Sequence, residues 1–314
     1  MTKLSLIVPC YNEEQNVEAF YARCQEVFPT DQYEVVFVND GSKDGTYKKL
    51  QKLHEEHDNI LVVNFSRNFG KESAIYAGLH YASGSYISII DADLQQDPEI
   101  VRNMVNILEE KPDIDVVAAY QAQRHEGKLM SWCKDRFYKF INRLSEVDLR
   151  ENASDFRTFQ ASVQKALLDM PEYFRFSKGL FSWVGFETEY IPYEAAERFA
   201  GTTKWSFTKL LKYAMEGIIS FSTLPLQLAT FFGAIVSAIA IIYGIVIIAQ
   251  TLITGIDVPG YATTIVVVLF LGGVQLLVMG ILGEYLAKTY IQGKHRPVYI
   301  AKNVLEKKNT KEEN

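Results

Sequence analysis

In the stretch Tyr86-Ile-Ser-Ile-Ile-Asp-Ala-Asp-Leu-Gln95 an apolar run ends directly in two carboxylates that are separated by one small residue. Such a run is typical of a buried strand whose end presents acids to a cleft. Successive strand residues face opposite sides, so we expect Asp91 and Asp93 to share one face. Two converging carboxylates favour Mg²⁺ or Mn²⁺, which keep positions open for substrate phosphates. A second interpretation stays open, in which both aspartates cap the helix that starts near Asp97-Pro98-Glu99.

Apolar runs alternate with amphipathic stretches from residue 3 to residue 120. The runs predicted as strands are Leu4–Val8, Val35–Val38, Ile60–Phe65, Tyr86–Ile90 and Val116–Ala119. The predicted helices are one with Val17, Phe20, Cys24 and Val27 near a 3.6-residue period, then Thr46–His57, Glu72–Ala82 and Pro98–Glu110. Strands that alternate with helices predict an α/β fold with a mostly parallel sheet, covered by helices on both faces.

Every notable polar motif of this region follows a predicted strand. The motifs are Pro9-Cys-Tyr-Asn-Glu13, Asn39-Asp-Gly-Ser-Lys-Asp44, Ser66-Arg-Asn-Phe-Gly70 and Asp91-Ala-Asp93. Ligands of such sheets bind beyond the carboxyl ends of the strands, so we expect these motifs to frame one pocket. Asp40 and Asp44 can bond ribose hydroxyls or base edges, although Asp44 suits a helix cap at Gly45-Thr46 equally well. The sequence contains neither G-x-G-x-x-G nor a P-loop string, which argues against those two kinds of nucleotide site.

Two long uncharged stretches predict a membrane hairpin. Leu226–Ile253 and Ala262–Leu282 each exceed the length of about 20 residues that spans a hydrocarbon core. The linker Thr254–Gly260 has no Lys or Arg, whereas basic residues flank the pair on both sides, so we expect both termini in the cytoplasm. Two buried helices of a soluble protein would fit these lengths poorly. Ser206–Ser222 is amphipathic and suits either a helix in the membrane interface or an ordinary core helix.

Charge and cysteine content narrow the class of protein. The chain of 314 residues carries 32 Lys and Arg against 38 Asp and Glu. Seven of the basic and five of the acidic residues lie from Leu224 onward, which leaves 25 basic and 33 acidic residues before it and a net charge of −8. That balance argues against a nucleic-acid partner. The three cysteines form no C-x-x-C pair and fit reduced thiols in a cytosolic domain.

Six strings together carry a resemblance to family-2 glycosyltransferases. They are Val8-Pro-Cys-Tyr-Asn-Glu13, Val38-Asn-Asp-Gly-Ser-Lys-Asp-Gly-Thr46, Asn68-Phe-Gly-Lys-Glu-Ser-Ala74, Asp91-Ala-Asp-Leu-Gln-Gln-Asp-Pro98, Ser154-Asp-Phe-Arg157 and Arg198-Phe-Ala-Gly-Thr-Thr-Lys204. The resemblance extends from Leu4 through the hairpin. The chain most resembles the branch that contains dolichyl-phosphate mannose synthase and bacterial polyprenyl-phosphate glucosyltransferases.

This resemblance implies a GT-A fold, which is Rossmann-like with a mostly parallel sheet, followed by a two-helix transmembrane hairpin. It implies a nucleotide-sugar donor with UDP-glucose favoured, Mg²⁺ or Mn²⁺, undecaprenyl or another polyprenyl phosphate as acceptor, inversion at the anomeric carbon, and a homo-oligomer. We expect a cytoplasmic catalytic domain over residues 1–205, an interface helix over 206–223, transmembrane helices over 224–290 and a cytoplasmic tail over 291–314. The protein would lie in the cell membrane.

The resemblance also implies roles for single residues. The residues expected at the donor nucleotide are Pro9, Tyr11, Glu13, Asp40 and Asp91; those expected at the metal are Asp91, Asp93 and Gln95; those expected at phosphates are Arg124, Arg198 and Lys204. Asp93 and Asp155 are the expected catalytic residues. Asp155 would face the acceptor as a general base or as a positioning group, beside Ser154, where many relatives carry glycine. Two other functions stay open: a catalytically silent membrane scaffold, and a membrane-anchored glycosyltransferase with a non-lipid acceptor.

Overall fold

The chain divides into two compact units, one of which is built from two separate stretches of sequence. The computed structural model describes residues 3–29, 32–121, 153–194, 196, 223–254 and 260–307. One unit comprises Met1–Lys212 together with Arg296–Asn314, and the other comprises Tyr213–His295. The predicted interface helix over residues 206–222 lies outside the described residues.

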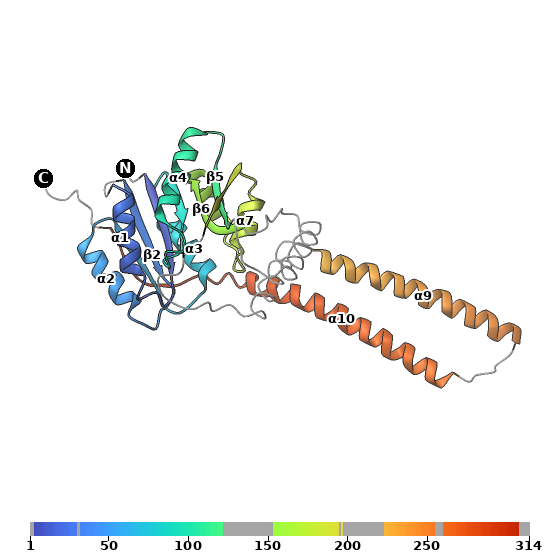
Figure 1. The fold of residues 1–314 in the computed structure, drawn as a ribbon. Helices are drawn as coiled ribbons and strands as arrows, with labels where there is room; N and C mark the ends of the chain where they lie inside the picture. The colour runs from blue at the N-terminus through green and yellow to red at the C-terminus, as the bar shows by residue number, and fades with distance from the viewer. Residues whose placement is uncertain are drawn as a thin grey trace. The chain divides into compact units, whose positions relative to one another are not determined.

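The first unit combines one sheet with flanking helices (Figure 1). Its strands are β1 (Leu4–Cys10), β2 (Tyr33–Asn39), β3 (Ile60–Phe65), β4 (Tyr86–Ile89), β5 (Val116–Gln121), β6 (Ala153–Gln160), β7 (Thr188–Tyr193) and β8 (Ala301–Leu305). Its helices are α1 (Val17–Val27), α2 (Thr46–Glu56), α3 (Lys71–Tyr81), α4 (Pro98–Glu110), α6 (Ala161–Leu168) and α7 (Ser177–Trp183). The elements predicted up to residue 120 are confirmed, with ends displaced by one or two residues.

The strand order is β7-β5-β6-β4-β1-β2-β3-β8. Strands β4, β1, β2 and β3 are neighbours and run parallel, which confirms the mostly parallel sheet. Strand β6 runs antiparallel to both β4 and β5. Because β1 lies between β2 and β4, the strand order reverses at β1, and the loops that follow these strands open around the usual ligand crevice of such sheets.

Helices cover both faces because the central strands are apolar on both sides. On β2, Val35 and Phe37 pack into a core with α1, α2 and α4, whereas Val36 and Val38 pack into a second core with α3. All four side chains are fully buried. Continuous burial along a strand is the pattern of a parallel sheet between two helical layers.

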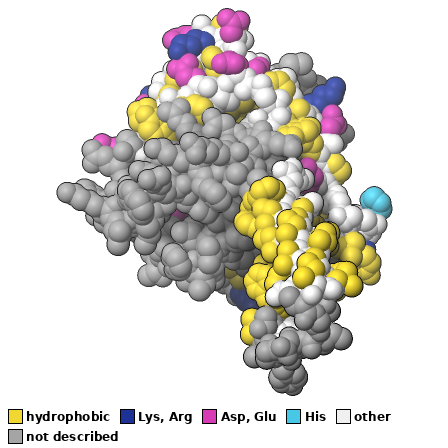
Figure 2. Space-filling view, turned by 90° about the vertical axis from the view of Figure 1, so that its right-hand side faces the viewer, with side chains coloured by type: hydrophobic (Ala, Val, Ile, Leu, Met, Phe, Trp, Pro, Cys, Tyr) yellow, Lys and Arg dark blue, Asp and Glu magenta, His cyan; other side chains and the backbone are white. Residues whose placement is uncertain are grey.

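The second unit is a hairpin of two long apolar helices, α9 (Leu224–Thr254) and α10 (Tyr261–Gly293), which lie side by side (Figure 1). Its two candidate membrane spans, Pro225–Gln250 and Val266–Gly293, are long and apolar enough to cross a bilayer. Figure 2 shows hydrophobic side chains gathered over its surface, and Phe270 is 59% exposed. An apolar surface of this extent is typical of contact with lipid or another apolar partner.

After the hairpin the chain returns to the sheet. The segment expected to be a tail contains β8, which pairs antiparallel with β3 at the edge of the sheet. Val63 lies opposite Val304, and Asn64 lies opposite Asn303. Both ends of the hairpin are therefore joined to stretches of one and the same domain.

Candidate active site

The turn after β4 carries the two aspartates that the sequence singles out. Strand β4 ends at Ile89, so strand alternation does not reach Asp91 and Asp93, and the expectation based on it is corrected. The turn is held locally: the Asp91 N–H donates to Gln96 Oε1 at 3.1 Å, and the Gln95 N–H donates to Asp93 Oδ1 at 3.2 Å. Leu94 has a φ of 58°, an uncommon conformation for a residue with a side chain, as is frequent at functional sites.

Helix capping falls to other aspartates. Asp97 is the N-cap of α4, since its Oδ1 accepts the Glu99 N–H at 2.9 Å, with Pro98 in the first turn. Asp91 and Asp93 are therefore not the caps of this helix. Asp44 accepts the Thr46 N–H at 3.1 Å at the start of α2, so the structure favours the capping interpretation for Asp44.

Lys71 joins two acids from different parts of the sheet. As the first residue of α3, it places its Nζ 2.6 Å from Asp91 Oδ1 and 3.7 Å from Asp155 Oδ2. Strand β6 brings Asp155 there because it runs antiparallel to β4, with Arg157 opposite Ile89. Lys71 had no predicted role, although it lies in the string Asn68–Ala74 and directly follows the loop after a parallel strand.

Asp155 is an ionised carboxylate with an unsatisfied oxygen. Burial alone would raise its pKa, but Lys71, Lys178 and Arg157 outweigh burial and hold the pKa of Asp155 below its ordinary value. Its Oδ1 is buried and accepts no hydrogen bond from any residue that the structure describes. This oxygen therefore has the capacity to accept a hydrogen bond from a bound ligand or water.

The pKa of Glu72 is shifted in the opposite direction from that of Asp155. Its Oε2 accepts hydrogen bonds from the backbone N–H, at 2.9 Å, and from the hydroxyl of Ser177. Burial, and then the negative charge of Asp155, raise the pKa of Glu72 to about 7. Of the two carboxyl groups, Glu72 is therefore the one that takes up a proton near neutral pH.

Asp40 supports the loop that follows β3. Its side chain is buried, and its Oδ1 and Oδ2 accept the backbone N–H groups of Phe69 at 2.6 Å and Gly70 at 2.9 Å. Burial raises the pKa of Asp40 to about 6, although these hydrogen bonds act in the opposite direction. The loop approaches so closely that a Cβ at Gly41 would lie 2.4 Å from the Arg67 carbonyl carbon.

The loops after β1 and β2 interlock at the same edge. The Asp40 N–H donates to the Cys10 carbonyl at 2.9 Å, and the Glu13 N–H donates to Thr46 Oγ1 at 2.9 Å. Between these contacts the Tyr11 side chain is 36% exposed. The structure thus brings Pro9, Tyr11, Glu13 and Asp40 to the carboxyl edge of β1 and β2.

The three residues expected at the metal, Asp91, Asp93 and Gln95, all carry side-chain oxygen atoms. Asp91 and Asp93 supply carboxylates, and the Gln95 side chain reaches the Ala196 carbonyl with its Nε2 at 3.4 Å. Hard oxygen ligands fit Mg²⁺ or Mn²⁺. No cluster of three His, Cys, Asp or Glu residues suited to a metal occurs within the described ranges. Arg124, Arg198 and Lys204 lie outside those ranges.

Comparison with known families identifies the chain. The model of "Glycosyl transferase family 2" matches residues 5–169, and that of "GtrB C-terminal hairpin" matches residues 224–289. The chain belongs to glycosyltransferase family 2. The family resemblance inferred from its six strings is thereby confirmed, and so is a GT-A fold with a two-helix C-terminal hairpin.

Relatives of similar length carry informative names. The "Prophage bactoprenol glucosyl transferase homolog" of Escherichia coli K12 is 42% identical over 304 residues, which cover 96% of this chain and 99% of that protein. The "Bactoprenol glucosyl transferase" of Shigella phage SfV is 41% identical over 307 residues, which cover 97% of this chain and all of that protein.

The chain is similar to a solved structure of the glucosyl-3-phosphoglycerate synthase of Mycobacterium tuberculosis, which was crystallised with Mn²⁺, uridine diphosphate and phosphoglyceric acid. The alignment covers 69% of this chain and 76% of the synthase chain. The TM-score is 0.52 at 16% identity, a likeness of fold.

Proposed function

We propose that the chain transfers a hexose from a nucleotide-diphosphate sugar, with UDP-glucose favoured, to a polyprenyl phosphate such as undecaprenyl phosphate. The observation that carries this proposal is the shared cation: Lys71 contacts Asp91, the acid expected at the donor diphosphate, and Asp155, the acid expected at the acceptor. Group transfer requires donor and acceptor in one pocket. The bactoprenol named for relatives at 41–42% identity supports a lipid carrier as the acceptor.

Charge development in the reaction suits this set of residues. The leaving nucleoside diphosphate gains negative charge, and cationic groups placed where charge develops stabilise the transition state. Asp91, Asp93 and Gln95 would hold Mg²⁺ or Mn²⁺, which when bound supplies such a charge. Lys71 supplies a second positive charge at the same place.

The acceptor needs little activation. A lipid phosphate has a second pKa of about 6 by analogy with phosphoesters, so it is already an anion near neutral pH. Asp155, whose pKa is lowered, stays ionised and orients the acceptor or removes a remaining proton. Attack from the face opposite the leaving group would invert the anomeric carbon.

The hairpin fits an acceptor that stays in the bilayer. Because β8 returns to β3, the chain enters and leaves the hairpin from one domain, as two crossings of a membrane require. Basic residues flank both helices, which favours a cytoplasmic catalytic domain in the cell membrane. A domain held at the surface meets the phosphate of the lipid without extracting its tail. We further propose a homo-oligomer, in line with the family resemblance.

The experiment is a transfer assay with the full chain in membranes, undecaprenyl phosphate, Mg²⁺ or Mn²⁺ and a panel of nucleotide sugars, with the product identified by mass. The expected product is undecaprenyl phosphate-hexose, formed from UDP-glucose and absent with Asp155→Asn. Sugar transferred only to a water-soluble acceptor would favour the non-lipid alternative. Absence of transfer with every donor would favour the scaffold.

A further inference from the structure

A segment beyond the hairpin completes the catalytic domain. We call residues 296–307, which begin shortly after α10 ends, the C-terminal strap. Its strand β8 pairs with β3, and the pairing extends past the end of β3, where the Ser66 N–H donates to the Ile300 carbonyl at 3.0 Å. Ser66 is the first residue of the loop Ser66–Gly70. The strap therefore reaches the loop whose backbone N–H groups donate to Asp40.

An aromatic series connects the strap to that loop. Tyr299 stacks on Phe65, with ring centroids 5.0 Å apart and an interplanar angle of 17°. Phe65 in turn meets the edge of Phe69 at 5.7 Å and 88°. The backbone N–H of Phe69 is the group that donates to Asp40 Oδ1. Packed rings of this kind restrict one another because a displaced ring loses its contact area.

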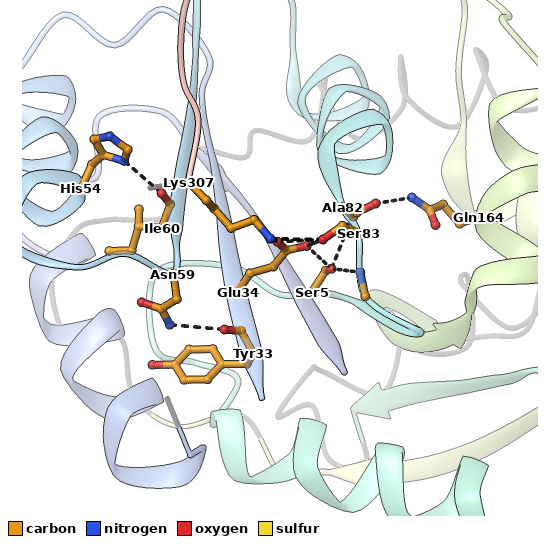
Figure 3. A network of polar contacts seen from close by, with 11 residues as sticks. Ser5, Tyr33, Glu34, His54, Asn59, Ile60, Ala82, Ser83, Gln164 and Lys307 are labelled. Atoms are coloured by element: carbon orange, nitrogen blue, oxygen red, sulfur yellow. Dashed lines mark hydrogen bonds and ion pairs between the residues drawn. The ribbon is translucent and has the colours of Figure 1, made fainter. Parts of the chain in front are cut away.

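An ion pair between a partly exposed lysine and a buried carboxylate anchors the other end of the strap. Lys307 contacts Glu34 of β2, whose side chain is 1% exposed (Figure 3). Glu34 Oε1 also accepts from Ser5 Oγ at 2.5 Å and from the Ser83 N–H at 2.7 Å. Loss of Lys307 would leave the buried carboxylate of Glu34 without a compensating charge, which is costly, so the ion pair fixes this end of the strap.

We propose that the C-terminal strap is a positioning element of the donor pocket, in which Tyr299 holds the loop Ser66–Gly70 against Asp40 while Lys307 fixes the strap on Glu34. As far as it concerns the donor, this inference rests on the proposed function, in which Asp40 binds the nucleoside. Tyr299 is a positioning residue, because it acts through Phe65 and Phe69.

The test compares four full-length variants in detergent. Tyr299→Ala removes the ring, Tyr299→Leu keeps apolar volume without the flat stack, and Tyr299→Phe keeps the stack without the hydroxyl. Ile300→Ala is the matched control, because the neighbouring Ile300 side chain is 51% exposed. Two quantities are measured: amide hydrogen exchange of a peptide covering residues 66–72, and the Kd of UDP.

We expect Tyr299→Ala and Tyr299→Leu to lower protection of the loop amides by roughly tenfold, with peptides from β5 unchanged. The Kd of UDP should rise by about fivefold, as for coupling through packed contacts. Tyr299→Phe and Ile300→Ala should match the unaltered protein.

Unchanged loop exchange in a folded Tyr299→Leu protein would overturn the inference, and so would an unchanged Kd. If the unaltered chain binds no UDP, the proposed function is what fails, and hydrogen exchange alone then decides whether the strap positions the loop.

Discussion

The Lys71 ammonium lies 2.6 Å from the Asp91 carboxylate, so the first residue of α3 neutralises the first acid of the turn after β4. A divalent ion at Asp91 would share that carboxylate with Lys71. The local charge of the pocket therefore depends on the lysine as well as on the expected metal.

Replacing Lys71 should slow transfer without unfolding the domain. Lys71→Met removes a cation next to the leaving diphosphate, and we expect kcat to fall by about 100-fold, as for other groups that stabilise developing charge. Lys49→Met is the matched control, since it removes another lysine–carboxylate pair, between Lys49 of α2 and Glu18 of α1, whose atoms lie 2.8 Å apart. Equal kcat values for both variants would remove Lys71 from the reaction.

Asp93→Ala should abolish metal-stimulated transfer. Loss of one carboxylate weakens a site that depends on few protein ligands. The measurement is the initial rate against added Mg²⁺ or Mn²⁺ after chelation. Asp97→Ala removes the cap of α4, at a cost of about 1 kcal/mol of stability, together with the ion pair between Asp97 and Arg23, and it should keep its metal response. Full activity of Asp93→Ala in metal-free buffer would contradict the metal role.

Donor binding should weaken as the pH falls through about 6. Burial raises the pKa of Asp40 to about 6, so its carboxylate becomes protonated there and accepts hydrogen bonds less well. The raised pKa also means that the free energy of unfolding decreases as the pH rises from 3.8 to about 6, because the folded state binds the proton more tightly.

Calorimetry of UDP binding between pH 5 and 8 measures this effect. The Asp40→Asn variant should bind UDP more weakly at pH 7.5. Its UDP affinity should also lose the part of the pH dependence that comes from Asp40 and keep the part that comes from the diphosphate. Identical pH profiles for both proteins would exclude Asp40 as the titrating group.

Lys307→Ala should destabilise the catalytic domain by about 2–4 kcal/mol, because Glu34 would stay buried without its cation. Burial would raise the pKa of Glu34, but Lys307 and the serine donors outweigh it and lower that pKa. This stabilisation is therefore present above pH 4.5, the ordinary value, and is lost as the pH falls through the lowered pKa.

Unfolding of the full chain in detergent at pH 7 and pH 4 checks this, with exposed Lys302→Ala as the control that should change stability by less than about 0.5 kcal/mol. If Lys307→Ala lowers the free energy of unfolding by no more than the control does, the ion pair contributes little to stability.

A protease site placed in the linker over residues 255–259 tests the orientation of the hairpin. We expect cleavage only from the side opposite the catalytic domain, because the linker has no Lys or Arg while the flanks are basic. Cleavage in inverted vesicles, where the cytoplasmic face is outside, would contradict the proposed orientation.

Most of the catalytic domain was predictable because its signals are local. Continuous apolar runs such as Ile60–Phe65 and helical periods such as that of Val17, Phe20, Cys24 and Val27 are properties of neighbouring residues, and the elements that they predict are present. The hairpin was predictable for the same reason, since an uncharged length of chain is visible without its partners. The position of the motifs after β1, β2 and β4 at one edge of the sheet was predictable, because parallel strands place the loops that follow them at that edge.

Two features depended on contacts between distant parts of the chain. The ion pairs of Lys71 and the strand β8 have no local signature, because Ala301–Leu305 has five residues and mixes apolar with polar side chains on both of its faces. Strand β8 exists because the edge of β3 offers unpaired backbone groups, and Lys307 is held because Glu34 is buried. Periodicity and charge-free length are set along the chain, whereas pairing and charge compensation exist only once folding brings the partners together.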